Sequence, residues 1–198
     1  MSAHGHSHGA HDWSDKEYVA EWIAKDEGRG ERRELLDSML AAAPFAKDAA
    51  ITVLDVGGGN GRVTDAVLRA FPNAKVTLQD FSQPMLDQAK QRFASKAGQM
   101  SYVLADLTQA GWEKKVGGPF DLAVSGIAIH NLRELPAIAA VYKAVRAVMK
   151  PGGCFLDCDH FDRAGGLEAN KDAFRQGGFS KVELVGAEGH PTTLKAIV

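Results

Sequence analysis

The chain has 198 residues, of which 45% are hydrophobic and 24% are charged, and its formal net charge is −2. This length suits one domain with a full hydrophobic core, and the composition excludes an intrinsically disordered chain. The lack of a basic excess argues against a dedicated nucleic-acid-binding protein. No apolar stretch reaches the roughly 18 to 20 residues that span a bilayer, and no signal-peptide core is present, so we expect a cytoplasmic protein with no membrane partner.

The first 50 residues differ in character from the rest of the chain. Residues 1–12 hold four of the seven histidines among glycine, serine and alanine, and predict a flexible tail. These imidazoles could capture a transition metal, but their spacing offers no preformed geometry, and no metal site is predicted. Ser14 and Glu17 make a capping box, which predicts a helix starting at Ser14. A second helix is predicted over 31–40, and residues 13–50 are expected to form a lid.

From residue 51 onward, apolar runs alternate with amphipathic stretches. The runs are ITVLDV, AKVTLQD, SYVLAD, FDLAVSG and GCFLDCD, and helical stretches follow Arg62, Gln83, Gln109 and Glu134. This βαβα alternation predicts a parallel sheet with helices on both faces. After a last helix over 167–176, the runs FSKVELVG and TTLKAIV are too close for a parallel crossover and predict an antiparallel hairpin at or near the sheet edge. The predicted fold is therefore α/β, a seven-stranded Rossmann-like sheet with strands 1–5 parallel.

The two cysteines lie in the same predicted strand. At about 3.3 Å per residue, the Cα atoms of Cys154 and Cys158 would lie roughly 13 Å apart. That separation is too long for a disulfide bond, so both are predicted to be reduced, buried thiols.

The stretch VLDVGGGNGR follows the pattern of a cofactor-binding turn after a strand. Gly57, Gly59 and Gly61 give G-x-G-x-G, whereas a dinucleotide site uses G-x-G-x-x-G, and its third glycine would fall at Arg62. Asp55 would repel a pyrophosphate, but it suits a cofactor with an ammonium group or a glycine turn whose N–H groups need acceptors. The pattern therefore disfavours a nicotinamide oxidoreductase.

VLDVGGGNG resembles motif I of the class I S-adenosylmethionine-dependent methyltransferases, whose usual form is D-x-G-x-G-x-G. Three further stretches match that family in order: VTLQDFSQPMLDQAK, YVLADL, and FDLAVSGIAIHNL followed by VRAVMKPGGCFL. Each match alone also has a structural explanation, such as a helix N-cap at Ser82. Together they cover residues 51 to about 160. The resemblance implies S-adenosylmethionine as cofactor and 51–198 as the domain that binds it and carries catalysis.

The resemblance also implies roles for individual residues in cofactor binding. Asp80 would accept hydrogen bonds from both ribose hydroxyls, and Phe81 and Met85 would flank the adenine. Asp106 would face the adenine amino group, with Leu107 at the ring edge. The full predicted cofactor set is Asp55, Gly57, Gly59, Gly61, Asp80, Phe81, Met85, Asp106, Leu107 and Ser125.

His130 is the predicted catalytic residue. It follows the fourth strand, where the methyl acceptor is expected, and an imidazole can act as a base near neutral pH. The alternative is that it braces the loop or caps the next helix. Asp157, Asp159 and His160, at the end of the fifth strand, are further candidates on the acceptor side.

The lid is expected to contribute aromatic and arginine side chains. The aromatic candidates for the acceptor pocket are Trp13, Tyr18 and Trp22, although such a stripe also suits plain core packing. Arg29, Arg32 and Arg33 are the arginines that could reach the methionine carboxylate of the cofactor.

The predicted function is methyl transfer to a small-molecule nucleophile by in-line displacement. SGIAIHN follows the fourth strand, in place of the carboxylates of a metal-dependent catechol enzyme or the Asn/Asp-Pro-Pro-aromatic motif of nucleobase amino methylation. A protein methyltransferase, a non-catalytic cofactor-binding module and aminopropyl transfer are the alternatives. The oligomeric state is open, a homodimer included.

Overall fold

The computed structural model describes residues 12–27, 31–186, 189 and 191–198. The predicted histidine-rich tail, apart from Asp12, and Arg29 lie outside the described residues. None of the helices in the described ranges combines the length and apolar character needed to cross a membrane.

Two helices precede the sheet, α1 (Lys16–Glu27) and α2 (Glu31–Ala41). The predicted start at Ser14 is wrong, because the Oδ1 atom of Asp15 accepts hydrogen bonds from the N–H groups of Glu17 at 2.7 Å and Tyr18 at 3.0 Å. A carboxylate is a strong N-cap acceptor and also complements the positive end of the helix. The Ser14 hydroxyl donates instead to Asp12. Asp15 therefore caps α1.

Within the described residues, seven strands form one sheet in the order β3-β2-β1-β4-β5-β7-β6. Strands β1 to β5 pair parallel, and β7 pairs antiparallel with both β5 and β6. The C-terminal hairpin thus lies at the sheet edge, as predicted, with β6 outermost. The strands are β1 (Thr52–Val56), β2 (Lys75–Asp80), β3 (Met100–Leu104), β4 (Phe120–Gly126), β5 (Met149–Asp159), β6 (Lys181–Val185) and β7 (Thr192–Ile197).

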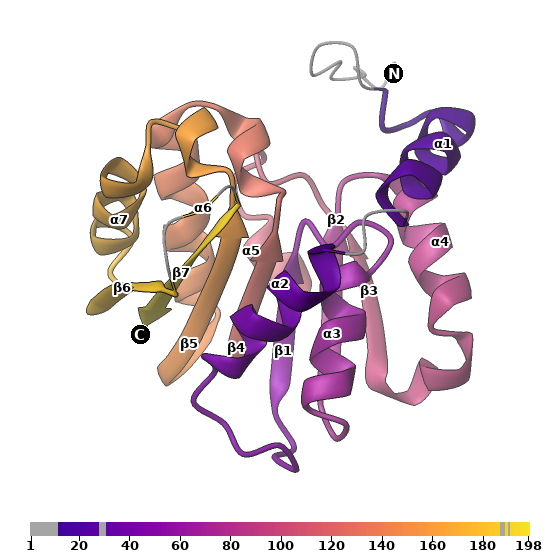
Figure 1. Cartoon of the computed structure of the whole chain (residues 1–198), viewed down its shortest axis with the longest axis horizontal. Coiled ribbons are helices and arrows are strands. Elements are labelled where there is room, and N and C mark those ends of the chain that lie inside the picture. The colour runs from indigo at the N-terminus through magenta and orange to yellow at the C-terminus, as the bar shows by residue number, and fades with distance from the viewer. Residues whose placement is uncertain (1–11, 28–30, 187–188, 190) are drawn as a thin grey trace.

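Helices cover both faces of the sheet, which confirms the predicted fold class (Figure 1). The helix predicted after Gln109 is a single turn, Glu113–Val116. The remaining helices are α3 (Arg62–Ala70), α4 (Gln83–Arg92), α5 (Glu113–Val116), α6 (Leu135–Ala147) and α7 (Leu167–Gln176), with 3-10 turns η1 (Ala94–Gln99), η2 (Ile129–Leu132) and η3 (Phe161–Arg163).

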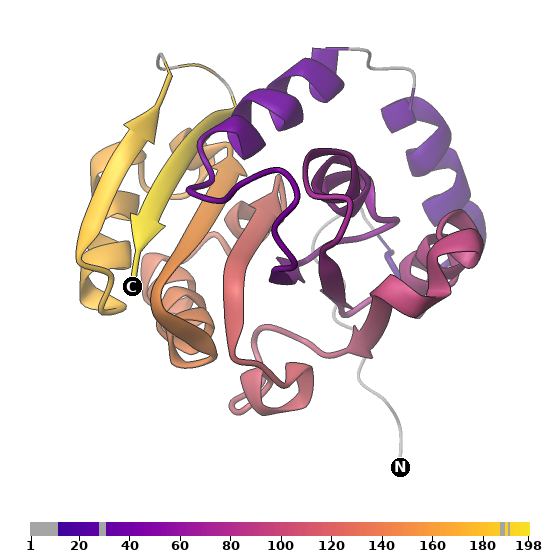
Figure 2. The ribbon, with the colours of Figure 1, turned by 90° about the horizontal axis from the view of Figure 1, so that it is seen from below.

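The core consists of two apolar layers, one on each side of the sheet. Side chains alternate along β1, so Val53 packs with α2 and α3 on one face, and Leu54 packs with α6 and α7 on the other. Met39 of α2 is buried in the first layer, where α2 contacts α3 and β5. Figure 2 shows α2 and α3 on one side of the sheet and α5 and α6 on the opposite side. The α2 helix is therefore part of the core, and α1 alone extends beyond it towards α4.

Cys154 and Cys158 are buried free thiols, as predicted. Burial raises the pKa of each thiol to about 12, so neither is a thiolate at neutral pH.

Candidate active site

A pocket lies at the carboxyl ends of β1, β2 and β4. The chain leaves β1 into α3 on one face and leaves β4 into η2 and α6 on the other, so the pocket occupies the place where the connections diverge. Open α/β sheets bind ligands at such a switch point. The pocket is walled by the glycine turn after β1, the end of β2, the loop after β3, η2 and parts of α1 and α2.

The N–H groups of the glycine turn are occupied by β2. Gly57 donates to Oε1 of Gln79, Gly58 donates to the Gln79 carbonyl, and Gly59 donates to Oδ2 of Asp80, each at 2.9 Å. A pyrophosphate would need these donors and would be repelled by the Asp80 carboxylate. The geometry therefore suits a ligand that brings hydrogen-bond donors rather than phosphates.

Asp55 lies beneath this turn and is fully buried. Its Oδ2 atom accepts a hydrogen bond from the Thr64 hydroxyl at 2.6 Å, and a Cβ on Gly58 would come within 2.9 Å of its carboxyl carbon. Burial raises the pKa of Asp55 to about 7, and the hydrogen bonds from Thr64 oppose that rise. The expectation that Asp55 accepts from the turn is wrong, because β2 supplies those acceptors. Asp55 is outside the described lining and fixes α3 to β1, and its contact with the cofactor stays a prediction.

Two further residues of the predicted cofactor set are not among the described lining residues. Ser125 is buried, and its hydroxyl donates to the Val56 carbonyl at 3.0 Å between β4 and β1. Gly61 begins α3 with φ 87°, where a Cβ would lie 2.4 Å from the Phe93 ring. Neither residue is part of the described pocket lining, and their cofactor contacts stay predictions.

Asp80 ends β2 at the floor of the pocket and is 6% exposed. Its Oδ1 atom accepts from the N–H of Ser82 at 2.8 Å, and its Oδ2 atom accepts from Gly59. Burial raises the pKa of Asp80 to about 6, and these backbone hydrogen bonds oppose that rise. Each carboxylate oxygen has a second lone pair, so the residue can still accept from two hydroxyl groups.

The predicted adenine contacts lie along the same pocket. Phe81 directly follows β2, Met85 lies in the first turn of α4, and Asp106 and Leu107 follow β3. The Oδ1 atom of Asp106 accepts from both the N–H and the hydroxyl of Thr108, at 2.8 and 2.7 Å, so its position is fixed. The pocket brings together seven residues of the predicted cofactor set: Gly57, Gly59, Asp80, Phe81, Met85, Asp106 and Leu107.

The α1 helix lies over the pocket. Trp13, Trp22 and Asp26 line it, and the Trp13 carbonyl accepts a hydrogen bond from the Ser82 hydroxyl at 2.6 Å. Tyr18 is outside the described lining and packs edge-on against the Trp13 ring.

Two of the candidate arginines can be placed in the structure. Arg32 lines the pocket and pairs with Asp26. Arg33 is 69% exposed, lies 3.9 Å from Asp37 and is outside the described lining.

The lining residues that the sequence interpretation missed include Asp26, Asn60 and Gln79. Gln79 was detectable as a buried polar side chain near the end of an apolar strand, where it holds the turn and donates to the Ala105 carbonyl at 2.6 Å. Asn60 stood within the glycine motif. No sequence pattern around Asp26 indicated a binding site, because α1 reaches the glycine turn after β1 only in the folded chain.

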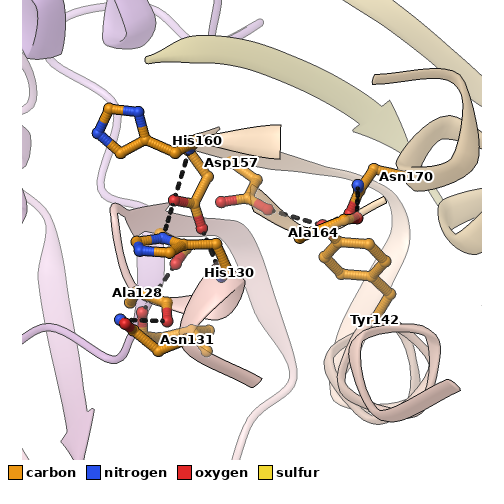
Figure 3. A network of polar contacts seen from close by, with 11 residues as sticks. Ala128, His130, Asn131, Tyr142, Asp157, His160, Ala164 and Asn170 are labelled. Carbon is orange, nitrogen blue, oxygen red and sulfur yellow. Dashed lines mark hydrogen bonds and ion pairs between the residues drawn. The ribbon is translucent and has the colours of Figure 1, made fainter. Parts of the chain in front are cut away.

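His130 forms a pair with Asp159, and the contact is drawn as a dashed line in Figure 3. Its Nδ1 atom lies 2.5 Å from one carboxylate oxygen of Asp159, and its backbone N–H donates to the other at 2.9 Å. Because a carboxylate only accepts, Nδ1 carries the proton and Nε2 of the neutral ring has a lone pair. His130 is outside the described lining, but Ala128 and Asn131 on either side belong to it.

Asp157 does not face the acceptor side, contrary to expectation. It is fully buried, and the Tyr142 hydroxyl of α6 donates to its Oδ2 atom at 2.9 Å (Figure 3). Burial and the nearby Asp159 carboxylate raise the pKa of Asp157 well above its ordinary value. Asp157 is thus part of the core under α6.

His160 is half-buried, with its ring edge-on to His130 at 5.7 Å. Burial lowers its pKa, and the positive charge of Arg163 lowers it further.

The pocket residues fit S-adenosylmethionine. Asp80 and Asp106 bring carboxylate acceptors to the pocket, which suit hydroxyl and amino donors, and apolar side chains line it beside them. The N–H groups of Gly57, Gly58 and Gly59 are already bonded and are not available to phosphates. A seven-stranded sheet with this turn and these acidic strand ends agrees with the resemblance of the sequence to the class I methyltransferases.

Comparison with known proteins supports that class. Residues 53–153 match the family described as "Methyltransferase domain". The mitochondrial 2-methoxy-6-polyprenyl-1,4-benzoquinol methylase of Caenorhabditis elegans is 35% identical over 104 residues, which cover 50% of this chain and 34% of that protein. The release factor glutamine methyltransferase of Chlorobaculum tepidum is 38% identical over 89 residues, 43% of this chain and 30% of that protein. The matched segment thus spans about a third of either relative.

A solved structure shares the fold. An O-methyltransferase family protein from Burkholderia thailandensis superposes with a TM-score of 0.71 at 18% identity, over 95% of this chain and 60% of that one. The chain belongs to the class I S-adenosylmethionine-dependent methyltransferase family, and S-adenosylmethionine is its cofactor.

Proposed function

We propose that the chain transfers a methyl group to a small-molecule nucleophile, with His130 as the base and Asp159 as its positioning residue. The observation that carries this proposal is the His130–Asp159 pair, which follows β4 and β5 immediately beside the cofactor pocket. We further propose that α1, within residues 13–50, acts as the lid. A cytoplasmic location and a homodimer stay predictions.

S-adenosylmethionine supplies a methyl group that its positive sulfur already activates, so the chain's residues need only align the acceptor, exclude water and remove a proton. Nε2 of His130 accepts the proton of the nucleophile. Asp159 holds the Nδ1 proton, fixes the tautomer and stabilises the positive ring that results.

The pocket lining supports a small, largely apolar acceptor. Trp13, which precedes α1, Trp22 of α1 and Leu132 of η2 bring aromatic and aliphatic surface to it. The benzoquinol methylase relative acts, by its name, on a polyprenyl benzoquinol, which favours an aromatic ring compound over a protein as the acceptor. The release factor relative favours a protein acceptor as the alternative.

Turnover with a panel of acceptors tests this proposal, with S-adenosylhomocysteine release as the measurement. We expect product with phenols or quinols and none with peptides. His130→Gln should lower kcat by about 100-fold or more, in the range of lost general-base catalysis, while the affinity for S-adenosylhomocysteine stays unchanged. Asp159→Asn should lower kcat less and shift the pH profile of kcat.

His160→Gln is the matched control, because its described hydrogen bond to Asp159 runs through the backbone N–H. It should retain most of the activity. Full kcat in His130→Gln would contradict the base role. Product with peptides alone would establish the protein methyltransferase, and tight cofactor binding without product from any acceptor would favour a binding module.

A further inference from the structure

Two residues of the loop after β4 have a backbone conformation that side chains disfavour. Among the described residues, Ile127 at φ 55° and Arg133 at φ 62° are the only ones other than glycine with a positive φ. A left-handed backbone brings the Cβ atom close to the following carbonyl oxygen, and the crowding is greatest for a β-branched residue such as isoleucine. Glycine takes this conformation freely. A residue that keeps a side chain there is therefore a candidate for a function of that side chain.

The conformation of Ile127 follows from how β4 ends beside β5. Gly126 pairs with Cys158, and the N–H of Ile127 donates to the Cys158 carbonyl at 2.8 Å, so Ile127 continues the pairing by one hydrogen bond. The next residue of β5, Asp159, holds both the backbone N–H and the ring of His130. Ile127 and His130 are thus bonded to consecutive residues of β5, and the chain turns between these two anchor points.

The Ile127 side chain is not part of the apolar core. It is half-buried and belongs to none of the apolar clusters that the described residues form, whereas its neighbour Ile129 is buried in the layer with α6 and α7. Ile127 lines the pocket, together with Leu132 of η2. The side chain therefore serves the pocket and does not stabilise the packing of the sheet.

Ile127 lies on the part of the pocket wall that the predicted cofactor contacts leave open. The contacts that line the pocket come from the turn after β1, the residues directly after β2 and β3, and the start of α4. Ile127 comes instead from the loop after β4, three residues before His130, the proposed base. Arg133 has the same backbone strain, but it is exposed and outside the described lining. Ile127 therefore differs from Arg133 in combining the strain with a place at the pocket.

We propose that the Ile127 side chain contacts the methyl acceptor and sets the bulk that is tolerated beside its nucleophile. This inference rests on the proposed function, because it requires the acceptor to bind at His130. A branched apolar side chain packs against a planar ring and excludes, by steric clash, branched groups next to the reacting hydroxyl. The acceptor class that fits is an aromatic hydroxyl compound with small substituents beside the hydroxyl group.

Methyl transfer by the full chain to phenol, 2,6-dimethylphenol and 2,6-diisopropylphenol tests this role, with S-adenosylhomocysteine release as the measurement. We expect the wild type to prefer the two smaller acceptors. Ile127→Ala should raise the ratio of kcat/KM for 2,6-diisopropylphenol to that for phenol by about tenfold or more, the range for added or missing methylene groups in a pocket. Ile127→Val should raise this ratio less. The pH profile of kcat should not change in either variant, because His130 is intact.

Arg133→Gly is the matched control, because it relieves the same backbone strain outside the described lining. It should leave the ratio of the two kcat/KM values unchanged. Ile127→Gly relieves the strain and also removes the side chain, so it should change the ratio as Ile127→Ala does. Urea unfolding of the ligand-free chain is the second measurement, and neither glycine variant should unfold at a lower urea concentration than the wild type.

An unchanged ratio in Ile127→Ala would overturn the inference, because it would show that the side chain does not select the acceptor. A lower urea midpoint in Ile127→Gly than in Arg133→Gly and the wild type would also overturn it, since the side chain would then stabilise the fold. Wild-type turnover of no phenol or quinol would contradict the proposed function, and the unfolding comparison then decides the inference by itself.

Discussion

Replacing Asp80 with alanine is expected to weaken S-adenosylhomocysteine binding by about 100-fold or more, about 2.7 kcal/mol at 25 °C. Asp80 has two functions in the structure, since its two oxygens hold the N–H groups of Gly59 and Ser82 and also face the pocket. The alanine variant loses both functions, and Asp80→Asn keeps one acceptor and the side-chain shape. Calorimetric titration at pH 7.5 measures the effect.

The pH dependence of binding separates the ligand contact from the structural role. Because burial raises the pKa of Asp80 to about 6, the carboxylate of the free protein protonates below that pH and loses acceptor strength. Affinity should therefore fall as the pH decreases from 7 to 5 in the wild type, and Asp80→Asn should show much less of this fall. Asp87→Asn on α4, which pairs with Lys90 at the surface, is the control. Unchanged affinity in Asp80→Ala would show that the ribose assignment is wrong.

Replacing Asp157 with asparagine is expected to stabilise the chain above pH 7, by roughly 1 to 3 kcal/mol. Burial and Asp159 raise the pKa of Asp157 well above its ordinary value, so the native state holds a proton that the unfolded state releases near pH 4. Where the native state binds more protons, the free energy of unfolding falls as the pH rises. Asparagine removes this proton linkage and can donate to the Tyr142 oxygen in the same place.

Urea unfolding at pH 5 and pH 8 measures this difference. The wild type should lose more stability between these values than Asp157→Asn does, while the surface control Asp172→Asn on α7 should follow the wild type. Part of the fall in the free energy of unfolding between pH 5 and pH 8 should persist in every variant. Burial also raises the pKa of Asp55 to about 7 and that of Asp80 to about 6, so these groups make the free energy of unfolding depend on pH as well. An equal change in the free energy of unfolding between pH 5 and pH 8 in the wild type and in Asp157→Asn would contradict a neutral Asp157.

The fold was predictable because its signals are local. Apolar runs of strand length alternate with amphipathic helices, and a connection of a few residues between the last two runs permits only an antiparallel hairpin. The start of α1 was misjudged by one residue. Asp15 and Ser14 are both suitable N-cap residues, and the Asp15 carboxylate, the stronger acceptor, binds the N–H groups of the first turn. The role of α2 in the core was hidden, since an apolar helix face does not reveal which surface covers it.

The pocket was predictable where it depends on strand ends. Asp80 and Asp106 follow β2 and β3, and parallel strands bring their carboxyl ends to one edge of the sheet. Asp55 and Ser125 lie outside the described lining, because a residue before the end of a strand can face the core instead of the pocket. The contribution of Asp26 depends on how α1 returns across the sheet, and no sequence pattern encodes that path.

Titration of the full chain with S-adenosylhomocysteine and with NAD tests the central claim most directly. The occupied N–H groups of the glycine turn and the Asp80 carboxylate predict that S-adenosylhomocysteine binds at one site per chain and that NAD gives no heat of binding. Binding of NAD without binding of S-adenosylhomocysteine would contradict it.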